Sequence, residues 1–123
     1  MKFKQPKNLN LLSIRLPLPA LVSILHRMSG ALLFLLMPFL TWAFCNSLSS
    51  ELNFAKTMLI LNSWPAKVIQ IFFIWALLHH LMAGLRHLLL DLQIGNDLIL
   101  ARFSSKTVLF VSFLLTTIIA YWI

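Results

Sequence analysis

The sequence predicts an all-α membrane protein that crosses the bilayer three times. Of its 123 residues, 60% belong to the apolar set AVILMFWYC and 11% are charged, whereas soluble domains are about 45–50% apolar and about 25% charged. A soluble domain of this length buries only about two-thirds of its unfolded surface, too little to hide so many apolar side chains. Three apolar stretches are long enough to span a bilayer, which takes about 20 residues. The composition disfavours a soluble enzyme and a secreted disulfide scaffold.

The first expected span covers residues 20–45. Pro17 and Pro19 end any helix that precedes it. Residues 1–19 contain an interrupted apolar patch with no clean small-residue cleavage site after it, so we expect a retained cytoplasmic segment lying along the membrane surface. Pro38 is expected to bend the first helix.

The second expected span covers residues 67–91, and the third covers residues 104–123. The link of residues 46–64 is rich in polar residues and reads as a loop with at most a short amphipathic turn. The link of residues 93–106 also reads as a loop. Residues 1–123 therefore form a single membrane-anchor domain.

Lysine and arginine are distributed unequally between the two sides of the expected membrane. Only Lys56 and Lys67 lie on the side of the first link. The other eight lie on or toward the side of the N-terminus: Lys2, Lys4, Lys7, Arg15, Arg27, Arg86, Arg102 and Lys106. Because cytoplasmic loops carry the excess of basic residues, we expect the N-terminus in the cytoplasm. Without a basic run longer than two, the net charge of +7 fits membrane-flanking charges and not a nucleic-acid partner.

Polar residues interrupt the first span at Ser23, His26, Arg27 and Gly30. The spacing places Ser23, Arg27 and Gly30 on one helical stripe, with His26 beside it. Charged residues within spans are costly and usually face a bundle interior or a cavity, although an arginine can also extend to the lipid headgroups. The stripe suits a haem propionate, a quinone carbonyl or a partner carboxylate, since the arginine fork binds two oxygens.

The second span carries five ionisable residues: His79, His80, Arg86, His87 and Asp91. Spacings of four, seven and eleven place His80, Gly84, His87 and Asp91 on one stripe, whereas His79 falls with Arg86 on a neighbouring face. Neutral imidazole is a common axial ligand of haem iron, and Gly84 leaves room for a flat porphyrin one turn from His80. The spacing favours His80 over His79 as the ligand, although a histidine here can also serve only as a hydrogen-bonding residue of the bundle. Arg86 and His87 follow about 9–10 Å along the axis, which suits cations beside haem propionates.

The sequence lacks the motifs typical of enzymes that act on soluble substrates. It contains no glycine-rich phosphate loop, no CxxC and no Ser-His-Asp arrangement. The chain could host a cofactor and a hydrophobic substrate only with help.

Two motifs resemble those of a known family. The first, S-x-x-H-R-x-[ST]-G, is matched by Ser23, His26, Arg27, Ser29 and Gly30. The second, H-x-x-x-G-x-R-H-x-x-x-D, is matched by His80, Gly84, Arg86, His87 and Asp91. Both resemble the signatures of the cytochrome b membrane-anchor subunit of succinate dehydrogenase, the larger of its two anchor chains. Residues 6–9 and 15–17 resemble that family's approach to the first helix, so the resemblance covers nearly the whole chain.

The resemblance implies that His80 is one axial ligand of a haem b shared with a second, smaller anchor subunit. It implies that Ser23 and Arg27 hydrogen-bond ubiquinone, and that His26, Arg27 and His87 lie near the haem propionates. It also implies an iron–sulfur subunit and a flavoprotein subunit on the cytoplasmic face, from which electrons of succinate reach ubiquinone. The chain would then be a subunit of a succinate:quinone oxidoreductase and no enzyme on its own, and the lack of a transit peptide favours a bacterial inner membrane.

Other interpretations stay open at the level of the residues. A proton or ion relay would use the intramembrane arginine and histidines, but it would need paired acids within the spans, where Asp91 is the only nearby one. A cytochrome b of another membrane oxidoreductase would bring haem-ligating histidines on several helices, and the third span has none. A purely structural or assembly protein would bind no haem.

Overall fold

The computed structural model describes residues 16–123, and this part of the chain is helical throughout, without a strand. Three long apolar helices and one short helix follow each other: α1 (Leu18–Ser49), α2 (Glu51–Leu61), α3 (Trp64–Asp91) and α4 (Leu98–Trp122). Since α1, α3 and α4 are long and apolar enough to cross a membrane, the prediction of an all-α protein with three transmembrane helices is confirmed. Most of the expected surface segment, residues 1–15, lies outside the described residues.

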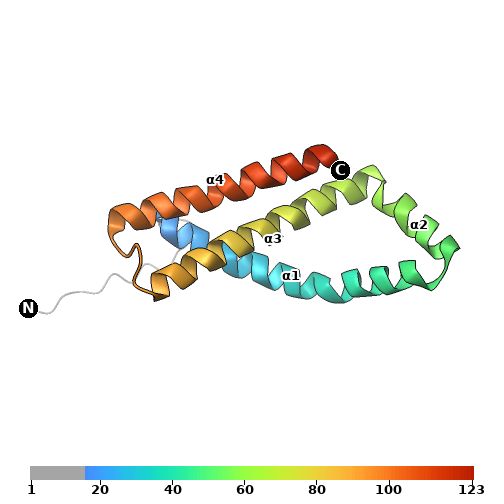
Figure 1. Ribbon diagram of the computed structural model, residues 1–123, viewed down its shortest axis with the longest axis horizontal. Coiled ribbons are helices and arrows are strands. Elements are labelled where there is room, and N and C mark those ends of the chain that lie inside the picture. Colours follow the sequence, from blue (N-terminus) through green and yellow to red (C-terminus); the bar gives the residue numbers. More distant parts are fainter. Residues whose placement is uncertain (1–15) are drawn as a thin grey trace, which may run out of the picture.

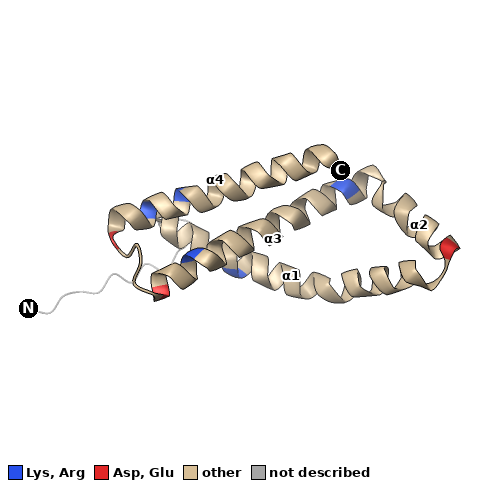
Figure 2. Cartoon of the chain, in the orientation of Figure 1, with Lys and Arg blue, Asp and Glu red and all other residues tan. Residues whose placement is uncertain are grey.

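The three long helices run alongside one another, and α2 connects α1 to α3 at one end of the molecule (Figure 1). The start of α1, the end of α3 and the start of α4 meet at the opposite end, so α3 runs antiparallel to both α1 and α4. Charged residues gather near these two ends and leave the middle of the bundle almost free of them (Figure 2). This distribution is the one expected for a bundle whose middle lies in hydrocarbon.

Proline and a serine cap determine where the first two helices begin. Pro17 precedes α1 in an extended conformation, and Pro19 lies in the first turn, where its missing N–H breaks no helical hydrogen bond. Pro38 lies within α1, and the helix curves away from α3 toward α2 in Figure 1. Most of the link of residues 46–64, which was expected to be a loop, is instead helix α2. The Ser50 hydroxyl caps this helix by accepting a hydrogen bond from the backbone N–H of Asn53 at 3.1 Å.

The turn between α3 and α4 depends on two left-handed residues. Gln93 has φ 61° and Gly95 has φ 80°, a region that glycine adopts without steric cost. Asp97 then precedes α4 in an extended conformation. This short turn keeps α3 and α4 adjacent along their whole length.

Small side chains let α4 pack closely on its neighbours. The buried core joins Val22 of α1, Ala83 of α3 and Val108 of α4. Ser105 and Ser112 are also fully buried on α4, and each hydroxyl donates to a carbonyl of its own helix, at 2.7 Å and 3.1 Å. Close packing through small residues, with polar groups satisfied internally, is typical of helix contacts in membranes.

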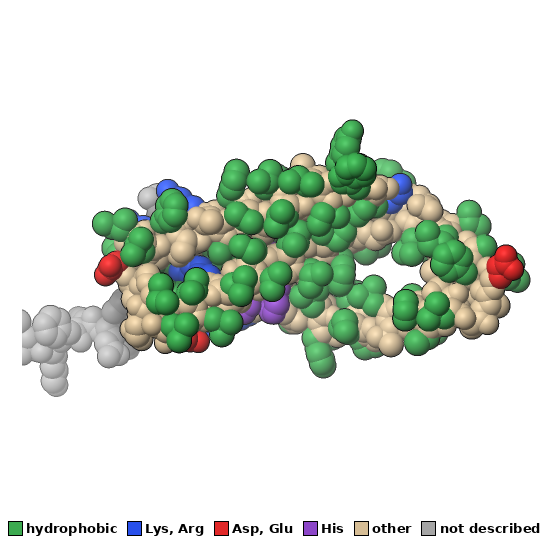
Figure 3. Space-filling view, viewed as in Figure 1, with side chains coloured by type: hydrophobic (Ala, Val, Ile, Leu, Met, Phe, Trp, Pro, Cys, Tyr) green, Lys and Arg blue, Asp and Glu red, His purple; other side chains and the backbone are tan. Residues whose placement is uncertain are grey.

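Large apolar side chains cover much of the outside of the bundle (Figure 3). Phe34, Trp42 and Phe113, for example, expose between 69% and 78% of their surface. In water such a surface would be unstable, whereas in a bilayer it faces lipid or other apolar helices.

Candidate functional site

Three histidines from two helices meet on one side of the bundle. His26 of α1 stacks on His80 of α3 with ring centroids 4.3 Å apart and an interplanar angle of 16°. His87, two turns further along α3, lies 5.1 Å from His26 at a tilt of 41°. The three rings line an open groove of about 420 Å³ whose other walls are Leu81, Gly84, Leu85 and Leu88. We call this the histidine groove; histidine side chains are visible there between α1 and α3 in Figure 3.

Two glycines allow the histidine rings to approach so closely. A Cβ atom on Gly30 would lie only 2.8 Å from Cε1 of His80. A Cβ atom on Gly84 would lie 3.4 Å from Nε2 of His26. Each helix thus carries a histidine followed four residues later by a glycine, and each ring lies over the glycine of the other helix. The sequence placed Gly30 on a stripe with Arg27, but its contact is with His80.

A hydrogen bond holds the Nδ1 side of the His80 ring. Nδ1 of His80 lies 3.1 Å from the carbonyl oxygen of His26, which can only accept, so Nδ1 donates in this contact. The Ser29 hydroxyl donates to the same carbonyl at 2.9 Å and lies 3.4 Å from Nδ1. An imidazole held in this way through Nδ1 is oriented to bind a metal through Nε2.

The groove suits a metal that arrives with ligands of its own. No group of three or more His, Cys, Asp or Glu side chains could hold a bare ion among residues 16–123. A single imidazole beside a groove with leucine walls instead fits a metal whose equatorial positions are already filled, as in a porphyrin. The candidate ligand and the shape of its surroundings therefore agree with a haem.

His79 has a different environment from its neighbour His80. Its side chain is completely buried and stacks on Trp75 at 5.4 Å, with the rings 22° apart. Within the described part of the chain neither ring nitrogen meets the geometry of a hydrogen bond, although the Val22 backbone lies close to the ring. The helix turn that brings His80 to the histidine groove directs His79 into the chain's own core, away from any cofactor in that groove.

Arg86 also turns away from the histidine groove. Its Nε donates to the Ser104 hydroxyl at 3.0 Å and its Nη2 to the Ala101 carbonyl at 3.4 Å, so the guanidinium lies against α4. The interpretation of Arg86 as a cation beside haem propionates is therefore not supported by the geometry. His87, in contrast, lines the groove as its spacing from His80 suggests.

The candidate quinone residues lie outside the groove. Ser23 is half-buried and Arg27 is exposed. Neither side chain forms a hydrogen bond with another residue in the range 16–123.

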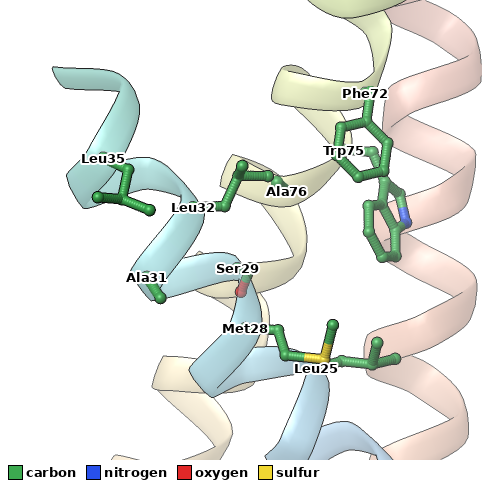
Figure 4. A pocket seen from close by; sticks show the side chains of 9 residues that line it. All are labelled: Leu25, Met28, Ser29, Ala31, Leu32, Leu35, Phe72, Trp75 and Ala76. Atoms are coloured by element: carbon green, nitrogen blue, oxygen red, sulfur yellow. The ribbon is translucent and has the colours of Figure 1, made fainter.

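An apolar pocket of about 410 Å³ lies between α1 and α3 on the other side of Ser29 (Figure 4). Its walls are leucine, methionine and alanine side chains of α1 together with Phe72, Trp75 and Ala76 of α3. Ser29 contributes the one polar side chain of its lining. The sequence identified Ser29 only as a position of the first motif and assigned it no role, although its position three residues after His26 places both on one face of α1.

The chain matches the family described as succinate dehydrogenase/fumarate reductase transmembrane subunit over residues 1–119. It is 36% identical to the succinate dehydrogenase cytochrome b556 subunit of Coxiella burnetii, covering 100% of this chain and 99% of that protein. It is 34% identical to the subunit of the same name from Paracoccus denitrificans, covering 85% and 81%. The corresponding protein of Rickettsia felis is 30% identical, with 94% and 90% covered.

Proposed function

Because the chain belongs to the succinate dehydrogenase/fumarate reductase transmembrane subunit family, we propose that it holds a haem b through His80 and contributes to a quinone site. Its function is that of the membrane-anchoring cytochrome b subunit of succinate dehydrogenase. The relatives are named cytochrome b556 subunits, which supports a haem b in this chain as well. The observation that carries the proposal is the His80 ring, held through Nδ1 by the His26 carbonyl, beside the histidine groove.

The residues in and beside the groove have separate proposed roles in binding the haem. His80 binds the iron through Nε2, and the hydrogen bond from its Nδ1 to the His26 carbonyl fixes the orientation of the ring. His26 and His87 donate hydrogen bonds to the propionates, and Arg27 supplies positive charge from α1. The leucine walls exclude water. When bound, the haem supplies reversible one-electron transfer, and ligation by two imidazoles suits this task because it leaves no open coordination position.

The second axial ligand comes from a partner chain. Among residues 16–123, only His26 and His87 accompany His80 in the groove, and both are assigned to the propionates above. We therefore propose a smaller anchor subunit that supplies the opposite histidine. The iron–sulfur and flavoprotein subunits complete the assembly and dock where the N-terminal end of α1 meets the α3–α4 turn.

Ser23 and Arg27 are the residues that this chain is proposed to contribute to the quinone site. Both lie in the first three turns of α1, close to the end of the bundle that carries most basic residues. A quinone can reach this depth from the lipid, and an electron donor in water can approach it from outside. The Ser23 hydroxyl donates to a carbonyl oxygen of ubiquinone, and the Arg27 guanidinium stabilises the negative charge that develops on that oxygen during reduction.

The proposed orientation rests on the charge distribution. The excess of lysine and arginine at the N-terminal side supports a cytoplasmic position for that side. The bacterial relatives support the inner membrane as the location.

Paired substitutions at adjacent histidines test the proposal. The complex is purified through a tag on this chain, and its reduced-minus-oxidised visible spectrum is recorded for wild type, His80→Ala and His79→Ala. We expect iron–sulfur and flavoprotein subunits to co-purify and the haem b band to be lost in H80A but retained in H79A. Equal loss in both variants, or a full band in H80A, would show that His80 is not the ligand.

A further inference from the structure

Arg86 is a buried cation without a carboxylate partner. Only 6% of its surface is exposed, and its two hydrogen bonds go to neutral acceptors, the Ser104 hydroxyl and the Ala101 carbonyl. The whole sequence has three acidic residues, Glu51, Asp91 and Asp97, so residues 1–15 contribute none. Glu51 lies at the far end of the bundle, and no carboxylate of residues 16–123 comes within ion-pair distance of the guanidinium.

Removing a guanidinium from water without a counter-charge is strongly unfavourable. The sequence could avoid this cost with a neutral residue, because Ser104 and the Ala101 carbonyl need no charged donor. A buried arginine at this position therefore indicates that an anion from outside the chain completes the site.

The pocket beside Arg86 restricts the size and kind of that anion. It measures about 240 Å³ and lies between the end of α3 and the start of α4. A partner helix, about 10–12 Å across, does not fit into it. Arg86 and Ser104 provide its polar lining, and its walls are apolar side chains that include Leu89, Leu90, Ile94, Leu100 and Phe103.

The depth of the pocket matches the headgroup region of a bilayer. Arg86 lies five residues before Asp91, the last residue of α3, which corresponds to about 7.5 Å along the axis. Leu100 and Phe103 on the rim expose 49% and 69% of their surface, so the pocket opens among apolar side chains at the membrane boundary. An anionic group attached to hydrocarbon chains would pair with the Arg86 guanidinium and would also pack against the apolar walls of the pocket.

We propose that this pocket between α3 and α4 binds the phosphate of an anionic phospholipid, with Arg86 as its cation. The phosphate accepts hydrogen bonds from the guanidinium N–H groups that Ser104 and Ala101 leave free. The acyl chains lie against Leu100 and Phe103. The lipid then joins α3 to α4 at the end of the bundle where the other subunits dock.

The test uses the complete purified complex after removal of lipid with detergent. Phosphatidylglycerol, phosphatidylcholine and inorganic phosphate are titrated separately, and the melting temperature is followed together with the number of lipids retained in native mass spectra. We expect wild type to gain stability with phosphatidylglycerol and much less with the zwitterionic phosphatidylcholine. Arg86→Gln should bind phosphatidylglycerol about tenfold more weakly, since one set of charge-assisted hydrogen bonds is lost.

Two further variants serve as controls. Arg102→Gln removes an exposed positive charge at the same end of α4 and should behave as wild type. Ser104→Asp places a carboxylate within contact of Arg86, because the Ser104 hydroxyl already lies 3.0 Å from its Nε. The melting temperature of this variant should no longer rise with phosphatidylglycerol. If R86Q does not assemble, this result alone tests whether Arg86 binds the lipid.

Three results would overturn the proposal. The first is an identical response to phosphatidylglycerol in wild type and R86Q, or in wild type and S104D. The second is an equal stabilisation by inorganic phosphate, which would indicate a site for a soluble anion. The third is loss of the other subunits from R86Q with unchanged lipid binding, which would show that Arg86 pairs with a carboxylate of a partner protein.

Discussion

Gly30→Ala is the most informative single change, because it adds one methyl group where the two histidine-bearing helices touch. The new Cβ would lie 2.8 Å from Cε1 and 3.2 Å from Nδ1 of His80, whereas carbon atoms in contact prefer about 3.5–4.0 Å. The ring must therefore move by about 0.7–1.2 Å. Such a shift lengthens the 3.1 Å hydrogen bond from Nδ1 to the His26 carbonyl beyond hydrogen-bonding range.

Overpacking of this kind costs about 1–3 kcal/mol. If the cost falls on the ligand position, the apparent haem dissociation constant of G30A should rise about fivefold to a hundredfold. The assay is haem loss from the purified complex to an excess of apomyoglobin, followed by visible absorption. Gly84→Ala is the control for adding a methyl group at the same helix contact, since its Cβ would lie 3.4 Å from Nε2 of His26, an ordinary van der Waals distance. A wild-type rate of haem loss in G30A would refute the close approach of His80 to α1.

The remaining predictions concern residues around the same contact. Ser29→Ala should retain haem but shift its midpoint potential in a redox titration, because the hydroxyl shares the His26 carbonyl with His80; an unchanged potential would remove Ser29 from this role. His79→Phe should leave the thermal stability of the complex unchanged or raise it by about 1 kcal/mol, because it removes two buried nitrogens without partners; a loss of 2 kcal/mol or more would contradict this. Ser23→Ala and Arg27→Ala should lower ubiquinone reduction about tenfold or more while succinate oxidation with a soluble artificial acceptor stays intact; a parallel fall of both activities would indicate an assembly defect.

Hydropathy alone was sufficient to predict the three long helices, because each has enough consecutive apolar residues to cross a bilayer. The same criterion missed α2 and the start of α4, which begins at Leu98 within the link of residues 93–106 that was expected to be a loop. A helix of 11 residues between two spans has neither the length nor the charge pattern that distinguishes it from a loop, and only its serine cap indicates where it begins.

Helical spacing correctly separated the faces of α3 but could not show what each face contacts. It grouped His80 with Gly84 and His87, and all three line the histidine groove. It also grouped Arg86 with His79, and both are buried. The role assigned to Arg86 failed because the position of α4, which accepts its hydrogen bonds, depends on a turn and a packing angle that spacing does not encode.

The contacts between helices were the least predictable part of the site. Gly84 was read as space for a porphyrin beside its own helix, yet the nearest side chain over it is His26 of α1. Ser29 was named as a position of the first motif but received no role, because a serine within a span has no evident function until the ring that it contacts is known. Both depend on the register between antiparallel helices, which is set by packing and not by the sequence of either helix.

Chemical rescue of the proposed ligand tests the central claim most directly. His80→Gly removes the imidazole and leaves space beside Gly30, so the complex should lose its low-spin haem b spectrum, and added imidazole should restore it in a saturable way. His79→Gly, treated identically, should keep the spectrum without imidazole. A low-spin spectrum in H80G that is independent of added imidazole would contradict the assignment of His80 as the iron ligand.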